Sequence, residues 1–104
     1  MTPTIPTPGT LNKYGLSRDA FISLLASQGG VCAVCKAIPK GHWCIDHEHV
    51  KGWKKLPSEK RVKYVRGILC WRCNYYYACR GITVERALNL ADYLRRYEFR
   101  KEQS

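Results

Sequence analysis

The sequence is poor in acidic side chains: eight Asp and Glu stand against eighteen Lys and Arg, which gives a formal net charge of +10. A surplus of this size on a small domain favours a polyanionic partner, although a solvated basic surface is the simpler alternative. The sequence also lacks an apolar run long enough to cross a bilayer and a basic amphipathic helix at its start. We therefore expect no membrane partner.

The first residues lack the apolar segment of a signal peptide. Residues 1–13 instead contain Pro3, Pro6 and Pro8 with threonines between them, which predicts a flexible, extended tail. We expect one folded domain over residues 14–104, located in the cytoplasm, where thiols stay reduced.

Four of the six cysteines form two pairs with the spacing Cys-x-x-Cys, and 34 residues separate the pairs. A two-residue gap lets one tight turn direct both sulfurs at one ion, and two such turns complete a tetrahedron. In a reducing compartment this pattern predicts a structural Zn²⁺ held by Cys32, Cys35, Cys70 and Cys73. Four thiolates leave no open position for a substrate, so this site closes the fold and performs no chemistry.

Hydrophobic periodicity and capping residues predict a mixed α+β domain. Ser17 and Thr83 are suitable N-caps, and Gly81 is a suitable helix end. A polar, basic loop is expected over residues 50–63. We expect helices over residues 18–28, 74–81 and 83–98, and short strands over residues 43–49 and 64–69.

Four titratable residues in a row, from Asp46 to His49, end the first expected strand. Alternation places Asp46 and Glu48 on one face and His47 and His49 on the other, unless a twist at the strand end brings Asp46 and His47 together. By themselves these residues fit a solvated edge or histidines that only make hydrogen bonds. Asn74 directly follows the last zinc cysteine, so the zinc turn also fixes its place.

Several sequence blocks together resemble the phage recombination endonuclease VII family, within the His-Me finger (HNH) nucleases. They cover most of residues 14–94 in matching order and spacing. The blocks are Tyr14-Gly15-Leu16, Gln28-Gly29-Gly30-Val31-Cys32-Ala33-Val34-Cys35, Asp46-His47-Glu48-His49, Val65-Arg66-Gly67-Ile68-Leu69-Cys70, Cys73-Asn74 and Ala91-Asp92-Tyr93-Leu94.

The resemblance implies a zinc-stapled ββα-metal core in which a hairpin packs on a helix. It also implies that Asp46 and Asn74 hold a catalytic Mg²⁺ or Mn²⁺, that His47 is the general base, and that His49 supports the site. The implied substrate is branched DNA such as a Holliday junction, met during DNA recombination in the cytoplasm of a phage's host cell. Cutting such a substrate implies a homodimer, for which the terminal helices are candidates.

Two features depart from the family pattern. The connection between the Asp-His element and the second strand is longer, from residue 50 to residue 63. Tyr77 stands where some members carry an acidic residue, one helical turn after the asparagine, so a third carboxylate is absent or supplied elsewhere, for example by Glu48.

Basic residues crowd the segment 51–66, which contains a single acid, Glu59, and the aromatic residues Trp53 and Tyr64. This composition predicts a phosphate-binding surface beside the active site, with a solvated loop as the alternative. The candidate DNA contacts are Lys51, Lys54, Lys55, Lys60, Arg61, Lys63 and Arg66. We also expect at least one of the residues 75–77, all tyrosines, to be exposed and the others to pack in the core.

The leading function is therefore a Mg²⁺-dependent endodeoxyribonuclease selective for branched DNA. The alternatives are an HNH nicking endonuclease without that selectivity, a non-catalytic zinc-ribbon module that binds nucleic acid, and a structural zinc protein that meets RNA or another protein. His47, Asp46 and Asn74 favour an enzyme, because a binding module has no need for this combination.

Overall fold

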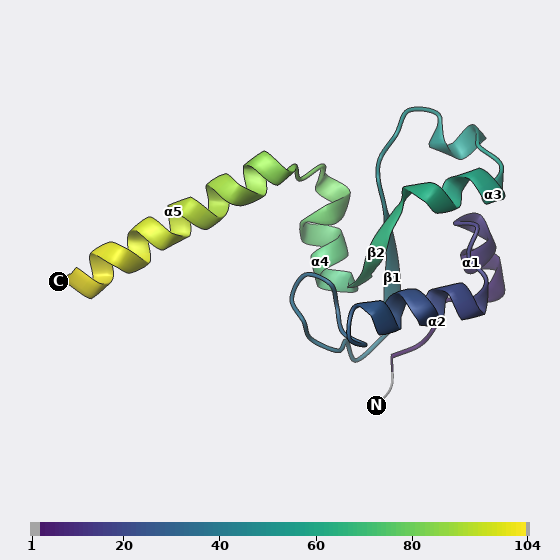
Figure 1. The fold of residues 1–104 in the computed structure, drawn as a ribbon, viewed down its shortest axis with the longest axis horizontal. Helices are drawn as coiled ribbons and strands as arrows, with labels where there is room; N and C mark the ends of the chain where they lie inside the picture. Colours follow the sequence, from purple (N-terminus) through teal and green to yellow (C-terminus); the bar gives the residue numbers. More distant parts are fainter. Residues whose placement is uncertain (1–2, 104) are drawn as a thin grey trace.

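The fold is α+β and is built around one antiparallel hairpin. The computed structural model describes residues 3–103. Strand β1 (Trp43–His47) pairs with strand β2 (Val65–Cys70), and helix α4 (Trp71–Tyr76) follows β2 without a break (Figure 1). A hairpin that runs directly into a helix is the ββα arrangement that the resemblance implies.

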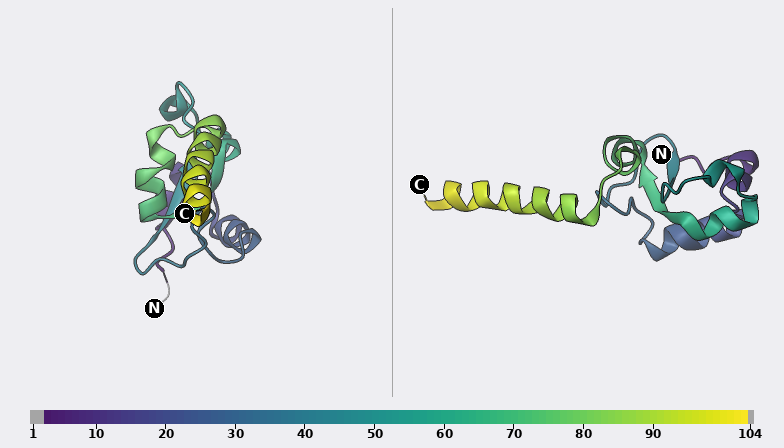
Figure 2. Two further views of the ribbon diagram at one scale, coloured as in Figure 1. Left: turned by 90° about the vertical axis from the view of Figure 1, so that its left-hand side faces the viewer. Right: turned by 90° about the horizontal axis from the view of Figure 1, so that it is seen from above.

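Two N-terminal helices lie on the side of the hairpin opposite α4 (Figures 1 and 2), α1 (Pro8–Lys13) and α2 (Arg18–Ser27). Helix α2 begins as predicted, because the backbone N–H of Ala20 donates to Ser17 Oγ at 3.0 Å. It ends at two glycines with positive φ, of which Gly30 returns its N–H to the carbonyl of Leu25 at 2.9 Å.

The flexible tail expected over residues 1–13 is wrong for the part that the structure describes. Proline is tolerated in the first turn of a helix, and Pro8 begins α1 behind an N-cap at Thr7. Leu11 on this helix is buried in the core. Ahead of it, Thr4 forms a backbone bridge with His42, an exposed residue. Residues 1 and 2 lie outside the described part of the chain.

The core is small, and the two zinc turns are part of it. Its side chains come from α1, α2, the hairpin and α4, and Phe21, Cys32 and Ile68 are fully buried. The members are Leu11, Leu16, Phe21, Cys32, Trp43, Ile45, Ile68, Leu69, Cys73 and Ala78. A core of this size gains most from an added cross-link such as a metal.

Gln28 joins the end of α2 to the outer edge of β2. Its amide nitrogen donates to the carbonyls of Val31 at 3.0 Å and Ile68 at 2.9 Å, and its amide oxygen accepts from the N–H of Ile68 at 2.8 Å. The N–H of Ala33 also donates to the Ile68 carbonyl at 3.2 Å. The free edge of the hairpin is therefore satisfied by a side chain and a turn instead of a third strand.

The segment between the strands is not the plain loop that we expected. It contains the short helices η1 (Trp53–Lys55), α3 (Ser58–Arg61) and η2 (Val62–Tyr64). The segment packs against the turn between α1 and α2: a Cβ on Gly15 would collide with the backbone oxygen of Ser58. Gly15 has a φ of +73°, so both its conformation and its surroundings require glycine.

The last helix, α5 (Val84–Gln103), extends away from the body (Figures 1 and 2). Thr83 caps it as predicted, accepting from the N–H of Arg86 at 3.1 Å. Of its residues, all described, none is buried, and the apolar side chains of Val84, Leu88 and Leu94 are between 51% and 77% exposed. None of the helices in the described chain is long and apolar enough to span a membrane.

The expected helix near Asn74 begins earlier than predicted. Cys70 acts as the N-cap of α4, with the N–H of Cys73 at 3.4 Å from its sulfur, so the second cysteine pair lies within the first helical turn. The helix ends at Tyr76 and is followed by a short turn, η3 (Ala78–Arg80), before Gly81. All three tyrosines 75–77 are exposed, so the prediction of at least one exposed tyrosine is confirmed and the prediction that the others pack in the core is wrong.

Candidate active site and metal centre

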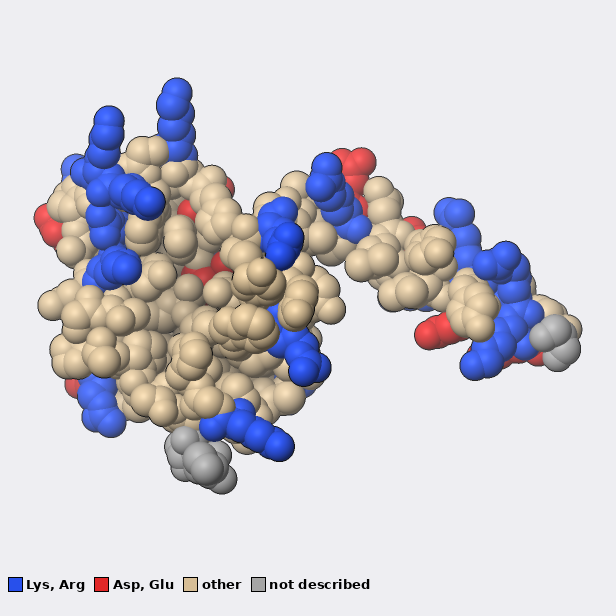
Figure 3. Space-filling view, turned by 180° about the vertical axis from the view of Figure 1, so that it is seen from behind, with Lys and Arg blue, Asp and Glu red and all other residues tan. Residues whose placement is uncertain are grey.

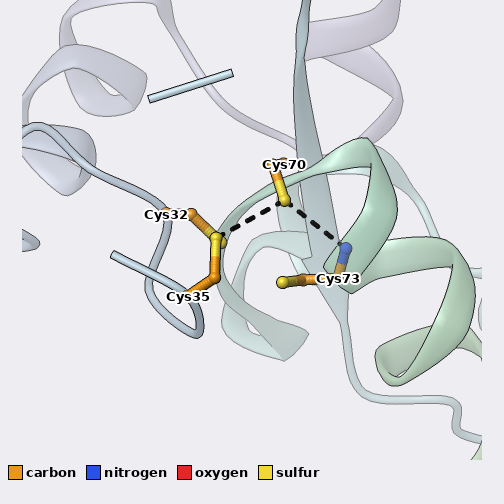
Figure 4. A group of neighbouring side chains, drawn as sticks. All are labelled: Cys32, Cys35, Cys70 and Cys73. Atoms are coloured by element: carbon orange, nitrogen blue, oxygen red, sulfur yellow. Dashed lines mark hydrogen bonds between the residues drawn. The ribbon is translucent and has the colours of Figure 1, made fainter. Parts of the chain in front are cut away.

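The four cysteines of the two pairs meet at one point, as the spacing predicts (Figure 4). Their sulfurs all lie within 4.8 Å of one another, and the Sγ atoms of Cys35 and Cys70 are 3.8 Å apart. A tetrahedral Zn²⁺ with Zn–S bonds near 2.3 Å separates its sulfurs by about 3.8 Å. The cluster therefore fits a structural metal ion, and zinc suits four thiolates best.

Local backbone geometry prepares the first zinc turn for a metal. Burial opposes ionisation of the Cys32 thiol, but hydrogen bonds from surrounding backbone groups and from Cys35 lower its pKa to about 6. Burial and the neighbouring sulfurs raise the pKa of Cys73. One thiolate is thus favoured before a metal arrives, and loading the site must release the remaining thiol protons.

The two other cysteines, Cys44 and Cys79, are free thiols. Cys44 is half-buried, whereas Cys79 is exposed.

Asp46 is the most deeply placed charged group of the hairpin. It is 7% exposed, and both its carboxylate oxygens accept hydrogen bonds from Arg66, at 2.7 Å from Nε and 3.0 Å from an Nη atom. The pairing is made possible by an irregularity in the sheet: Asp46 pairs with Gly67, but His47 pairs with Val65, so Arg66 is the extra residue of a bulge. The Arg66 side chain is 41% exposed.

His47 is held in an aromatic stack. Its ring lies 4.2 Å from the ring of Trp53 at an interplanar angle of 20°, and its other ring neighbours are His49 at 5.1 Å and Tyr14 at 5.6 Å. The two histidines therefore share one side of the strand end, as alternation predicts. Glu48 is exposed, so it does not share the burial of Asp46.

The position of Trp53 is fixed from its other side by Arg61. The Arg61 guanidinium lies 4.5 Å above the indole and donates to the carbonyls of Lys13 at 3.0 Å and Lys54 at 2.7 Å. Arg61, Trp53 and His47 thus form a continuous stack from the segment between the strands to the strand end. The sequence of this segment predicts a basic, phosphate-binding loop and does not predict that the segment positions His47.

The surroundings of His47 favour its neutral form. Burial lowers the pKa of the imidazole below 6.5, and the nearby His49 and Arg66 act in the same direction against the opposing effect of Asp46. A neutral imidazole near pH 7 can accept a proton, which is what a general base requires.

Asn74 lies in the middle of α4 and is half-buried. It lines a hollow of about 390 Å³ together with Tyr14, Cys44 and Ile45, so α4 presents it beside β1. The hydrogen bonds of the Asp46 carboxylate nevertheless go to Arg66, and the structure records none between Asp46 and Asn74.

The basic residues expected to contact DNA differ in whether they also bond within the protein. Lys and Arg side chains stand out from the body at the end away from α5 and also line α5 (Figure 3). Arg61 and Arg66, both expected to contact DNA, also bond within the protein as described above, and Arg66 is nevertheless exposed. The other candidates are all exposed: Lys51, Lys54, Lys55, Lys60 and Lys63.

Sequence reasoning missed two partners of the candidate catalytic residues. Arg66 ends a basic segment, which suggests only a DNA contact, and it reaches Asp46 because the bulge leaves it unpaired next to the Asp46–Gly67 pair. In the sequence, Trp53 is only an aromatic residue among lysines. An aromatic residue between charged neighbours is a weak signal, and only the fold connects it to His47.

Comparison with known proteins agrees with this geometry. A curated relative, the Gene 59 protein of Mycobacterium phage L5, is 32% identical over 68 residues. The match covers 64% of this chain and 35% of the relative, so the chain spans about a third of that protein's length. No solved structure matches the chain. The family described as recombination endonuclease VII matches residues 9–96, which include the four cysteines, the hairpin and α4. The chain therefore belongs to the recombination endonuclease VII family.

Proposed function

We propose that the chain is a metal-dependent DNA endonuclease that hydrolyses phosphodiester bonds. The observation that carries this proposal is the arrangement of two side chains at the end of strand β1. His47, whose neutral form is favoured, is stacked in a fixed orientation on Trp53, and the preceding residue of the strand, Asp46, is a buried carboxylate. Family membership supports the same activity.

Asp46 and Asn74 are the proposed ligands of a Mg²⁺ or Mn²⁺ ion. A carboxylate and an amide oxygen suit a hard cation that keeps most of its waters. Such an ion, when bound, supplies positive charge for the phosphate and the departing oxygen. The donor set fits on one condition: the guanidinium of Arg66 occupies both oxygens of Asp46 and must move aside. Its partial exposure leaves room for that movement.

His47 would take the proton from the attacking water while the P–O3′ bond breaks. The stack on Trp53 restricts rotation of the imidazole, so the base is oriented before the substrate binds. His49, whose ring lies 5.1 Å from that of His47, is placed to contact the phosphate or to orient its neighbour.

Metal binding tests this assignment apart from cleavage. Titration with Mn²⁺, followed by its electron paramagnetic resonance signal, should show one site in zinc-loaded protein that is lost in Asp46→Ala and weakened in Asn74→Ala. Arg66→Gln should bind Mn²⁺ more tightly, because the competing guanidinium is gone. Equal binding by all four proteins would remove Asp46 and Asn74 from the metal site.

The proposed DNA surface is the group of exposed lysines between the strands. Each phosphate contact steepens the dependence of log affinity on log salt by about 0.9. Replacing Lys54 and Lys55 by Gln should therefore weaken binding and reduce that slope by roughly 2. A double variant with the wild-type slope would exclude both lysines from the interface.

Branched DNA is the proposed substrate and a homodimer the proposed assembly. Selective cutting at a junction requires two active sites, and the exposed apolar side of α5 is a suitable contact between two copies. Sedimentation under nuclease conditions should show a dimer that Leu88→Glu dissociates. A monomer that cuts linear duplex as fast as a four-way junction would instead identify a non-selective nicking enzyme.

One observation favours a second candidate, a zinc-containing module that binds nucleic acid without cutting it. The doubly bonded Arg66–Asp46 pair gives the carboxylate a structural partner that needs no catalytic ion. In that case Asp46→Asn should destabilise the fold and leave the affinity for nucleic acid unchanged.

A further inference from the structure

Helix α4 carries an exposed aromatic cluster that the proposed chemistry does not use. We call Trp71, Tyr75, Tyr76 and Tyr77 the α4 cluster. Each of these side chains is between 43% and 53% exposed. Large aromatic side chains grouped on a surface mark binding sites more often than isolated ones do.

Within the cluster, three groups form an ordered stack. The rings of Trp71 and Tyr75 lie 5.0 Å apart and almost parallel, at 11°. The guanidinium of Arg80 lies 5.1 Å from the centre of the Tyr75 ring. Tyr76 meets both rings edge-on, at 81° and 89°. The order of the stack is therefore Arg80, Tyr75, Trp71, with a cation at one end and the indole at the other.

A hollow of about 720 Å³ lies at the indole end of the stack. Trp71 and Tyr77 form part of its wall, and Lys40, His42 and Arg72 supply positive or polar groups around it. Trp71 stands between Cys70 and Cys73, so the zinc turn fixes its backbone. Aromatic and basic side chains thus join the apolar lining of the hollow, and the zinc turn forms part of its wall.

We propose that this surface binds an unpaired nucleotide of DNA, with the base stacked on Trp71 and the backbone phosphate directed at Lys40 and Arg72. A base in a duplex has both faces covered by its neighbours, whereas an unpaired base offers a free face to an aromatic ring. The net charge of +10 and the basic residues Lys40 and Arg72 in the lining fit a polyanion better than an apolar peptide.

The inference rests on the proposed function for DNA as the partner and deepens it. Base pairs at a branch point open more readily than those inside a linear duplex. A site for one unpaired base, held a few residues along α4 from Asn74, would therefore favour branched over linear substrates without reading sequence.

Binding is tested in zinc-loaded full-length protein without Mg²⁺ or Mn²⁺, so that no cleavage is needed. The probes are a fluorescent oligothymidine strand and a blunt duplex of equal length, compared by anisotropy at physiological salt. Trp71→Leu should weaken strand binding about 5- to 150-fold, which is the range for one lost base stack. Tyr75→Leu removes only the support of the indole and should weaken strand binding less. Trp71→Phe should retain most of the affinity, and duplex binding should stay unchanged.

Tyr93→Leu is the matched control, because Tyr93 is an exposed aromatic residue on α5. Zinc content of each variant shows that the cysteine site is intact. An unchanged affinity of Trp71→Leu for the strand, an equal loss for strand and duplex, or a change in sedimentation without a change in binding would each overturn the inference. The last result would identify the cluster as a protein contact.

Failure of this inference differs from failure of the nuclease proposal. If the protein binds the strand through Trp71 but cuts no DNA, the nuclease proposal is wrong and the base-binding site stands. A chain that cuts DNA normally, and whose Trp71→Leu variant binds the strand normally, has the activity without the base site.

Discussion

Replacing Gln28 by Leu tests how the hairpin is held to the helices. The substitution keeps a side chain of similar size without branching at Cβ but removes the amide that bonds Val31 and Ile68. Ile68 is fully buried, so its N–H loses its acceptor with no access to water. Its carbonyl keeps the N–H of Ala33 at 3.2 Å.

The magnitude follows from those contacts. An unsatisfied buried N–H costs about 1–3 kcal/mol, and the lost bond to the half-buried Val31 carbonyl costs about 0.5–1 kcal/mol because water can partly replace it. We therefore expect Gln28→Leu to lower the free energy of unfolding by about 1.5–4 kcal/mol. Gln28→Glu should also destabilise the fold, because a carboxylate can accept from Ile68 but faces two carbonyl oxygens that it cannot donate to.

Urea unfolding followed by circular dichroism, at a fixed concentration of free zinc, measures the difference. Ser23→Ala, an exposed position on the same helix, is the control and should change stability by less than about 0.5 kcal/mol. A loss no larger than that of the control, at an unchanged denaturant slope, would refute the role assigned to Gln28.

Two further predictions concern the site. Because burial holds the pKa of His47 below 6.5, the acidic limb of kcat/KM should lie below pH 6.5, and stability should fall as pH drops from 6.5 through the folded-state value. Trp53→Ala exposes the imidazole and should move that limb upward; an unmoved limb would mean that the stack does not act on the base. Cys35→Ser should abolish stoichiometric zinc binding and cooperative unfolding, whereas Cys79→Ser, at an exposed free thiol, should alter neither. Full zinc content in Cys35→Ser would contradict the four-sulfur site.

Features that depend on short spacing were predictable from the sequence. Each Cys-x-x-Cys pair is a local turn, and one tetrahedral ion is the simplest way to satisfy two of them, so the cluster followed from the spacing. The caps at Ser17 and Thr83 are local as well, because a hydroxyl bonds a backbone N–H three residues ahead.

Features that depend on side chains meeting across the fold were not predictable. The pairing of Arg66 with Asp46 requires a bulge that no local pattern announces, and Trp53 reaches His47 only because Arg61 anchors the intervening segment. The prediction of an extended tail from the N-terminal prolines was wrong for a different reason. Pro8 occupies a helix start, where its missing N–H costs nothing, so a proline-rich composition did not exclude a helix.

The central claim is that His47 is the general base of a metal-dependent nuclease. The most direct test compares the zinc-loaded wild type with His47→Ala on supercoiled plasmid and a synthetic four-way junction, with and without Mg²⁺. We expect cleavage by the wild type only when Mg²⁺ is present, faster at the junction, and none by the variant, which should keep its zinc and its affinity for DNA. Cleavage by the variant at the wild-type rate, or none by the folded wild type with either Mg²⁺ or Mn²⁺, would contradict it.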